Sequence, residues 1–214
     1  MNAAISVQNV TKRFGDETVL TDVSREFEES KIHGIVGNNG SGKTVLMKCI
    51  CGFLIPDTGK VFVGHKQVGK DCDFPDDIGI IIETPGFLPG LTGMKNLQIL
   101  ASLKRKIDRN AVWEAIERVG LDPALKKPVG KYSLGMRQRL GIAQAIMENP
   151  SILILDEPLN GLDKNGVLQM RDLIKELRKQ GKTILLASHN QSDIDELCDT
   201  VCEMDAGLIK VVRK

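Results

Sequence analysis

Residues 37–44 carry the clearest chemical signal in the chain. They read Gly-Asn-Asn-Gly-Ser-Gly-Lys-Thr, which fits the phosphate-binding pattern of Gly, four variable residues, Gly-Lys and then Ser or Thr. The glycines let successive backbone N–H groups curl around phosphate oxygens without a Cβ in the way. We therefore expect Lys43 to reach the outer phosphates of a nucleotide and Thr44 to offer its hydroxyl to Mg²⁺. The expected phosphate-binding residues are Gly37, Asn38, Asn39, Gly40, Ser41, Gly42, Lys43 and Thr44.

Two carboxylates close an apolar run later in the chain. Residues 152–155 are Ile-Leu-Ile-Leu, which predicts a buried strand, and Asp156 and Glu157 follow it. Beside a phosphate-binding loop, we expect Asp156 to hold Mg²⁺ directly or through water. Glu157 is expected to polarise an attacking water as a general base. The alternative is a solvated strand end, which the phosphate-binding loop makes the weaker explanation.

The segments around these residues predict strands at both ends of the chain. Residues 31–37 read as a strand that runs into the loop, and residues 44–51 as a helix that directs its positive end at the phosphates. Period-two patterns and turn residues predict further strands, among them antiparallel strands near the N-terminus and a closing hairpin at Ala206-Gly207. These strand-like segments are 5–10, 18–27, 59–68, 78–82, 151–157, 182–189 and 201–214.

The middle of the chain has helical periodicity instead. Residues 94–106, 109–120 and 133–148 follow this pattern, and a further helix is expected from about 166 to 180. Parallel strands joined by helices predict an α/β fold with ligand sites at the carboxyl ends of strands. We expect one domain, residues 1–214, with a core formed by 1–84 and 151–214. A helical subdomain, 85–150, is inserted into it.

Composition and charge exclude several other classes of protein. The 214 residues carry a net charge of +1 and are 42% hydrophobic, without the basic excess typical of nucleic-acid binding. The N-terminal segment lacks a signal-peptide pattern, and no apolar run is long enough for a membrane span. The cysteines do not form a disulfide pattern. They are expected to be reduced thiols that act as small buried hydrophobes, in preference to a metal site. They are Cys49, Cys51, Cys72, Cys198 and Cys202.

Several classes of protein use a phosphate-binding loop, and residues 132–137, Tyr-Ser-Leu-Gly-Met-Arg, indicate which of them this chain resembles. Ser133 has the type and place of a helix N-cap, with Gly135 in the first turn, so this helix start offers a second anion site. The segment resembles the signature motif of ATP-binding cassette (ABC) proteins, usually Leu-Ser-Gly-Gly-Gln, with matches at Ser133 and Gly135. The positions that depart from it are Tyr132, Leu134 and Met136.

Other segments resemble further motifs of the ABC family in the same order. Asp163, in Asn-Gly-Leu-Asp at 160–163, resembles the end of the D-loop, and His189 resembles the switch histidine that reads the γ-phosphate. Phe14 falls where the family places an aromatic that stacks on adenine, although a lone Phe is more often a core residue. The resemblance covers nearly the whole chain. It implies a P-loop ATPase of the ABC type that binds ATP and Mg²⁺, with Phe14, Ser133, Gly135 and Asp163 at the nucleotide.

Glu83 ends the apolar run at 78–82, which predicts a strand buried on both faces. Taken alone, Glu83 is simply the point where the chain reaches the surface. The family normally has a Gln here, at the hinge to the helical subdomain, and that Gln senses Mg²⁺ and the attacking water. The segment resembles the bacitracin-resistance and lantibiotic-immunity branch, in which Glu replaces this Gln. The resemblance therefore implies a catalytic and Mg²⁺-binding role for Glu83.

Taken together, these resemblances imply the ATP-hydrolysing subunit of a transporter that exports peptide antibiotics or similar amphipathic compounds. Two such subunits, a homodimer or a pair of paralogues, would enclose ATP. They would drive a separate membrane permease from the cytoplasmic face of the membrane, with no nucleic-acid partner. The alternatives are a soluble ABC ATPase acting on nucleic acid or ribosomes and a small-molecule P-loop kinase. The first usually carries coiled-coil insertions or tandem cassettes, and the second would not need the motif at Ser133.

Overall fold

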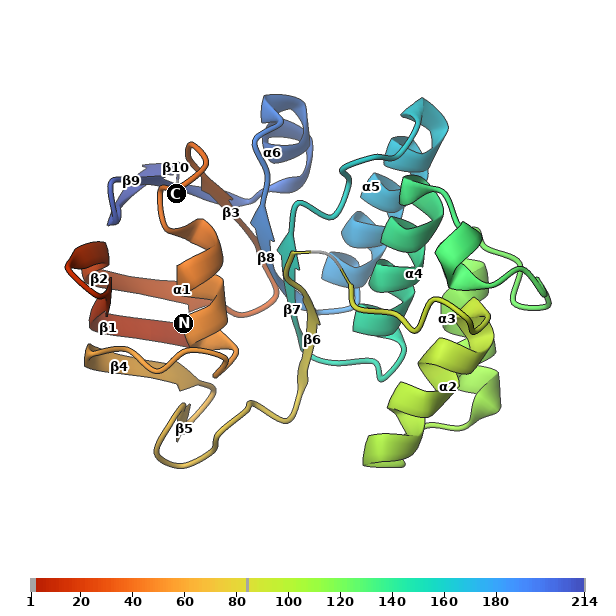
Figure 1. Ribbon diagram of the computed structural model, residues 1–214. Helices are drawn as coiled ribbons and strands as arrows, with labels where there is room; N and C mark the ends of the chain where they lie inside the picture. The colour runs from red at the N-terminus through yellow and green to blue at the C-terminus, as the bar shows by residue number, and fades with distance from the viewer. Residues whose placement is uncertain (1–2, 84, 214) are drawn as a thin grey trace.

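Two β-sheets and a group of helices make up the part of the chain that this computed structural model describes, residues 3–83 and 85–213 (Figure 1). The strands are β1 (Ala3–Phe14), β2 (Glu17–Glu28), β3 (Ile32–Val36), β4 (Thr58–Val63), β5 (Lys66–Gln67), β6 (Ile78–Ile81), β7 (Ile152–Asp156), β8 (Thr183–Ala187), β9 (Thr200–Asp205) and β10 (Leu208–Arg213). The helices are α1 (Lys43–Ile50), α2 (Gly93–Lys104), α3 (Arg109–Arg118), α4 (Leu134–Ile146), α5 (Lys164–Lys179) and α6 (Gln191–Leu197), with a 3₁₀ turn η1 (Val129–Lys131).

The six-stranded sheet has the order β10-β9-β3-β8-β7-β6 and positions the residues with predicted chemistry. β3, β8, β7 and β6 pair in parallel, and Ala187 of β8 lies between Ile35 of β3 and Asp156 of β7. Strands that run in parallel end at the same sheet edge. The loops after β3, β7 and β8 therefore emerge side by side.

The second sheet has the order β2-β1-β4-β5 and is antiparallel. Helix α1 lies between the two sheets, and its apolar residues share one core with both of them. Side chains alternate along the buried strands. In β8, Leu185 faces this core, whereas Ile184 and Leu186 face a second core built with the helices. The mixed α/β fold with an N-terminal antiparallel sheet is as predicted.

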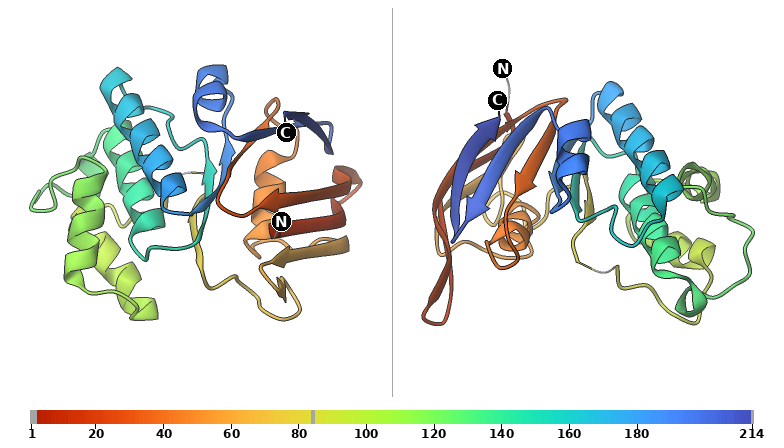
Figure 2. Two further views of the ribbon diagram at one scale, coloured as in Figure 1. Left: turned by 180° about the vertical axis from the view of Figure 1, so that it is seen from behind. Right: turned by 90° about the horizontal axis from the view of Figure 1, so that it is seen from above.

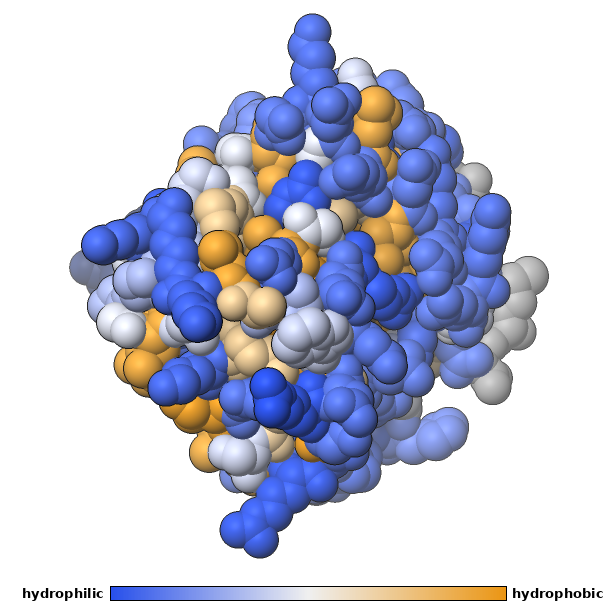
Figure 3. All heavy atoms as spheres, turned by 90° about the vertical axis from the view of Figure 1, so that its right-hand side faces the viewer, coloured by the Kyte–Doolittle hydropathy of each residue, from blue (hydrophilic) through white to orange (hydrophobic). Residues whose placement is uncertain are grey.

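Helices α2, α3 and α4, from the stretch predicted to form a helical subdomain, lie together on the side of the six-stranded sheet away from α1 (Figures 1 and 2). Figure 3 looks at this side, where polar side chains predominate and apolar ones form smaller interspersed areas. Both flanks of the helical stretch contribute strands to the six-stranded sheet. The subdomain boundaries at 84/85 and 150/151 stay a prediction.

The structure differs from the expected elements in several places. β6 is an edge strand whose residues alternate between buried and partly buried, so it is not buried on both faces as expected. Residues 59–68 form two paired strands, β4 and β5, because a turn at Gly64-His65 interrupts them. The predicted helix 166–180 starts earlier, at Lys164, because Asp163 caps it by accepting a hydrogen bond from Gly166 N. Helix α6 was not predicted.

His33, in the strand that leads to the phosphate-binding loop, is buried with both ring nitrogens bonded. Nε2 lies 2.8 Å from the Glu28 carbonyl oxygen, which only accepts, so Nε2 donates. Nδ1 then accepts from the Thr200 hydroxyl at 2.7 Å. Burial lowers the pKa of His33 below its ordinary value of 6.5. The neutral imidazole is therefore the form that the fold holds.

We predict that His33 makes folding stability depend on pH. Because its pKa is lower in the folded state, the unfolded chain binds the extra proton first as pH falls. Stability should therefore decrease as pH falls below about 6.5, by at most about 1.4 kcal/mol per pH unit for this single proton. Urea unfolding of His33→Gln between pH 7.5 and 5.5 should show a smaller slope than the unmodified chain. The exposed His65 is the control, and an equal slope in His33→Gln and His65→Gln would contradict the prediction.

Candidate active site

The predicted phosphate-binding loop joins β3 to α1, and its glycines meet different requirements, close packing at Gly37 and backbone conformation at Gly40. Gly37 has φ +148°, and a Cβ there would lie 2.2 Å from the Met204 carbonyl oxygen and 2.7 Å from Ser41 Oγ. Gly40 has φ +83° and open space beside it. The loop can thus press against β9 at its start while its middle stays accessible to a ligand.

Two side chains of the loop give a test of whether it fits phosphate. Lys43 is 7% exposed, and its Nζ donates to the carbonyl oxygens of Gly37, at 2.6 Å, and Asn38, at 3.0 Å. Ser41 Oγ is buried and has no hydrogen-bond partner within residues 3–83 and 85–213. A buried hydroxyl without a partner is costly. A phosphate oxygen in the loop would satisfy this hydroxyl and bring a counter-charge to the lysine.

Thr44, Asp156, Glu157 and His189 meet at the carboxyl ends of the parallel strands. Thr44 Oγ1 donates to Asp156 Oδ2 at 2.7 Å, which joins the start of α1 to the end of β7. His189, two residues after β8, has Nδ1 2.9 Å from Glu157 Oε1. The structure therefore joins Thr44 and Asp156, two of the three predicted Mg²⁺ ligands, and joins the predicted base Glu157 to the predicted switch histidine.

The backbone of Glu157 is held in place on both sides. Its φ is +50°, an uncommon conformation for a residue with a side chain. Its N–H donates to the Ala187 carbonyl oxygen at 2.9 Å, and its own carbonyl oxygen accepts from Gln138 Nε2 at 3.1 Å. These bonds fix the direction in which the carboxylate leaves the strand. Strained backbone that the surroundings hold in this way is frequent at active sites.

A cavity of about 410 Å³ joins these groups. It is lined by Val19, Asn39, Gly40, Ser41, Gly42, Lys43, Thr44, Val45, Glu83, Leu134, Gln138, Asp156, Glu157 and Asn160. Sequence reasoning missed Gln138, although Leu134 and Gln138 are four residues apart on α4 and so share one face of the helix. The sequence analysis already placed the start of this helix at the nucleotide, so the four-residue spacing could have predicted Gln138 as a residue of the site.

Glu83 also lines this cavity but is held in an ion pair. Its Oε1 lies 2.6 Å from Nζ of Lys48, in the last turn of α1, and its side chain is 63% exposed. Its φ is +60°, so the chain turns sharply there, two residues after β6 ends. The positive charge of Lys48 therefore lies beside the carboxylate of Glu83, the residue at the position where the ABC family normally has Gln. The predicted roles of Glu83 in catalysis and Mg²⁺ binding stay predictions.

Ser133, Gly135 and Asp163 do not line this cavity. They line a neighbouring hollow with Met136, Arg139, Gly161 and Leu162, and with Leu134, which lines both hollows. Ser133 caps α4, as predicted, by accepting a hydrogen bond from Met136 N at 3.2 Å, and Asp163 caps α5. One chain thus keeps its phosphate-binding loop and its signature residues in different hollows.

Phe14, at the end of β1, is 47% exposed, and Lys12 Nζ lies 5.6 Å from the centre of its ring. Phe14 is not among the residues that line the cavity, whereas Val19 of the neighbouring strand is. An exposed ring face at this place is available for stacking on a base. Its predicted contact with adenine stays a prediction.

Other candidate metal sites are weaker. In residues 3–83 and 85–213, no group of three or more His, Cys, Asp or Glu is arranged to hold a metal ion. All five cysteines are free, and Cys49, Cys51, Cys198 and Cys202 are buried. Burial raises the pKa of Cys49 to about 11 and that of Cys51 to about 12, which makes them poor metal ligands at neutral pH. Thr44 with Asp156 suits Mg²⁺, which takes few protein ligands besides phosphate oxygens.

Comparisons with known proteins agree with this geometry. A family described as "ABC transporter" matches residues 20–160. An uncharacterized ABC transporter ATP-binding protein of Bacillus subtilis, YybJ, is 42% identical, covering 98% of this chain and 96% of that protein. The bacitracin transport ATP-binding protein BcrA of Enterococcus faecalis is 41% identical, over 97% of this chain and 68% of that protein. The lantibiotic transport ATP-binding protein SrtF of Streptococcus pyogenes is 33% identical, over 92% and 85%.

Among solved structures, the fold is similar to the dimeric structure of MJ0796, described as a bacterial ABC transporter cassette. The TM-score is 0.88 at 23% identity, covering 98% of each chain. At this identity the likeness concerns the fold. The predicted resemblance to ABC ATPases, including the bacitracin and lantibiotic branch, is confirmed.

We predict that Lys43→Ala weakens ATP binding by at least about tenfold, roughly 1.4 kcal/mol, because it removes the buried cation from the phosphate-binding loop. Isothermal titration of the isolated chain measures this affinity. Lys60→Ala, which removes an exposed lysine from β4, is the control. If Lys43→Ala bound ATP as tightly as Lys60→Ala, the loop would not be the phosphate site.

Proposed function

The chain belongs to the ABC transporter family of ATP-binding proteins and is a transport-associated ATPase, and from this premise we propose that it powers the export of peptide antibiotics or similar amphipathic compounds. Relatives named for bacitracin and lantibiotic transport support this substrate class. No helix in the described residues is long and apolar enough to cross a membrane. We therefore propose a separate permease as partner, with this chain on the cytoplasmic side of the membrane.

The observation that carries the mechanism is that Ser133 and Gly135 do not line the cavity of the phosphate-binding loop, although Leu134 between them lines both hollows. Lys43, Thr44 and the carboxylates line one, whereas Ser133 and Gly135 at the start of α4 line the other. A single chain therefore offers either half of a nucleotide site but not both at one place. We propose that two chains face each other, so that the phosphate-binding loop of one meets Ser133 of the other across ATP. A solved cassette of the same fold is described as dimeric.

Within each composite site, the residues of this chain have distinct tasks. Lys43 and the loop N–H groups bind phosphate, and Thr44 with Asp156 would hold Mg²⁺, which offsets phosphate charge when bound. Glu157 accepts a proton from the attacking water as general base. His189, bonded to the Glu157 carboxylate at 2.9 Å, holds the base toward the γ-phosphate. Phe14 stacks on adenine, and Asp163 caps α5 beside Ser133 at the contact with the second chain.

Glu83 is proposed to couple the nucleotide site to the permease. It lines the cavity and lies close in the sequence to the start of the helical stretch 85–150. An ionised carboxylate accepts hydrogen bonds and brings negative charge, whereas the amide of Gln also donates. The ion pair with Lys48 compensates that charge. Mg²⁺ or a basic group on the permease could then compete with Lys48 for Glu83.

We predict that Glu157→Gln binds Mg-ATP but hydrolyses it about 10²–10⁴-fold more slowly, because the general base is lost. Since ATP persists, the variant should accumulate as a dimer, which light scattering with size-exclusion chromatography measures. A strictly monomeric ATP-bound form would contradict the composite site.

Adding Ser133→Arg to Glu157→Gln should leave ATP binding to the monomer intact and prevent dimer formation, because bulk at the start of α4 blocks the second chain. Ser102→Arg, on the exposed side of α2, is the matched control and should dimerise normally. Equal dimerisation of the two double variants would place the interface elsewhere.

We predict that Glu83→Gln keeps ATP binding and most basal hydrolysis, whereas Glu83→Ala loses more of both, because only Gln retains an oxygen ligand. In both variants transport should fall further than basal ATPase activity. The assays are ATPase activity of the isolated chain and drug resistance of cells with the permease present. Glu176, another ion-paired carboxylate of similar exposure, supplies the control Glu176→Ala. Unchanged resistance in Glu83→Ala would reduce Glu83 to a surface residue.

A further inference from the structure

His189 contacts the base Glu157, yet its own side chain is poorly fixed by packing. The side chain is 63% exposed. The residue before it, Ser188, is only 4% exposed. The position of His189 must therefore be fixed by contacts of the neighbouring residues in the loop after β8.

A buried carboxylate, Asp193, ties both neighbours of His189 together. Asp193 is 3% exposed, and its Oδ2 accepts from the Ser188 hydroxyl at 3.3 Å. The same hydroxyl accepts from the backbone N–H of Asn190 at 3.1 Å. The residues on each side of His189 are thus linked to one carboxylate, directly at 188 and through the shared hydroxyl at 190.

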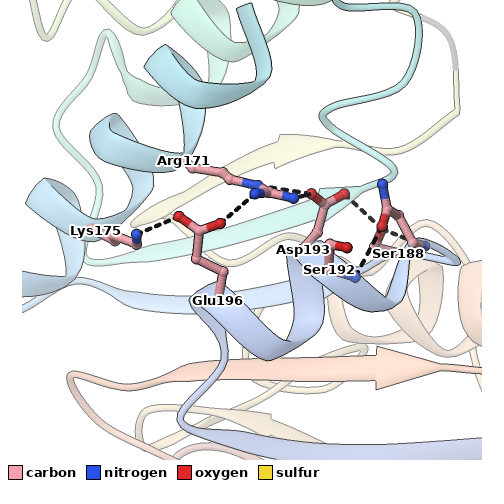
Figure 4. Close-up of polar contacts among 7 residues, drawn as sticks. Arg171, Lys175, Ser188, Ser192, Asp193 and Glu196 are labelled. Carbon is pink, nitrogen blue, oxygen red and sulfur yellow. Dashed lines mark hydrogen bonds and ion pairs between the residues drawn. The ribbon is translucent and has the colours of Figure 1, made fainter. Parts of the chain in front are cut away.

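Arg171 of α5 holds this carboxylate from the opposite side. Its Nε and Nη2 both donate to Asp193 Oδ1, at 2.9 and 2.5 Å, which leaves Oδ2 to Ser188. Its Nη1 donates to Glu196, whose other carboxylate oxygen accepts from Lys175 at 2.7 Å. Figure 4 shows this chain of contacts from α5, through the first residues of α6, to Ser188. The guanidinium is therefore fixed by two acids at once.

We propose that Arg171 and Asp193 are positioning residues for ATP hydrolysis, acting through Ser188 to hold His189 against Glu157. This inference rests on the proposed role of His189. Neither Arg171 nor Asp193 is among the residues that line the cavity. A loss of their contacts should therefore lower the turnover number without weakening the binding of ATP.

The same helix carries a second, more exposed arginine–aspartate pair that has no such link. Arg178 donates to both oxygens of Asp199, at 3.1 and 2.7 Å, and so also ties α5 to the chain beyond α6. Asp199 accepts in turn from the backbone N–H of Ile32, the first residue of β3. Because β3 and β8 are parallel, this contact lies at the end of the strands opposite to the loop that holds His189. An effect on hydrolysis from Arg171 but not from Arg178 therefore separates positioning of His189 from general support of α5.

The choice of variants follows from the burial of Asp193. Removing the arginine outright would leave a buried charge without compensation and endanger the fold. Arg171→Lys keeps the charge but loses the fork that bonds both acids. Ser188→Ala removes only the hydroxyl between Asp193 and the loop, and Ser188→Thr retains it. These variants keep the charges of the network intact.

The experiment measures kcat and KM for Mg-ATP in the dimeric ATPase, with Arg178→Lys as control. Arg171→Lys and Ser188→Ala should each lower kcat about tenfold with KM nearly unchanged, the usual scale for disturbing a residue that orients a catalytic group. Ser188→Thr should restore most of the activity. In a His189→Ala background neither substitution should lower kcat further, because their effect passes through His189.

Proton NMR gives a second readout that does not depend on activity. The chain has only three histidines, so the imidazole signals can be assigned by substitution. Arg171→Lys and Ser188→Ala should shift the His189 signals and leave those of His33 and His65 in place. Unmoved His189 signals, or an equal kcat loss in Arg178→Lys, would overturn the positioning role. An undiminished kcat in His189→Ala itself would instead refute the proposed role of His189.

Discussion

The parallel pairing of β3, β8 and β7 is the constraint on which the active site depends. Ala187 of β8 lies beside Ile35 on one strand and Asp156 on the other. The phosphate-binding loop, the carboxylates and the loop with His189 consequently begin at one level of the sheet. A slip of one residue would turn every side chain of a strand to the opposite face. Both faces of β7 and β8 are buried in apolar cores, so a slip would exchange side chains between two cores that are packed around others, and close packing is what opposes it.

The proposed composite site would make ATP hydrolysis a property of two chains. Helix α5 is capped by Asp163, which lines the hollow of Ser133, and it carries Arg171 about two turns further on toward the loop of His189. A rigid helix thus connects the surface proposed to meet the second chain with the residues that orient the base. The contact between Glu83 and Lys48 provides a separate connection, from the cavity to the turn before the helical stretch. Each connection depends on one ion pair, Arg171 with Asp193 in the first and Glu83 with Lys48 in the second.

Sequence patterns predicted the residues that follow apolar strands well, and for a physical reason. Asp156 ends one short buried strand and His189 lies two residues after another. Apolar runs located both strand ends, the family resemblance indicated the role of His189, and parallel pairing brought the two ends together. The helix start at Ser133 was predicted because N-caps have a strong local signature. Local signals of this kind need no knowledge of the rest of the fold.

The elements that sequence did not predict depend on distant partners. Helix α6 is only seven residues long, and its buried Ile194 and Leu197 have too few turns to produce a clear period. The bonds of Glu83 to Lys48 and of Arg171 to Asp193 join residues far apart in the chain, with no local pattern to indicate them. β6 was expected to be buried on both faces, but its position at the sheet edge follows from strand order, which its own residues do not encode.

The central claim is that each ATP site takes its phosphate-binding loop from one chain and Ser133 from the other. Its most direct test is the ATPase activity of a mixture of two variants, Lys43→Ala and Ser133→Ala, each of which impairs one half of the site. Ser133→Ala removes the hydroxyl without adding the bulk that prevents dimer formation. A mixed dimer contains one site with both defects and one site with neither. The account predicts that mixing restores hydrolysis well above the sum of the separate variants. Activity equal to that sum, with mixed dimers shown to form, would contradict it.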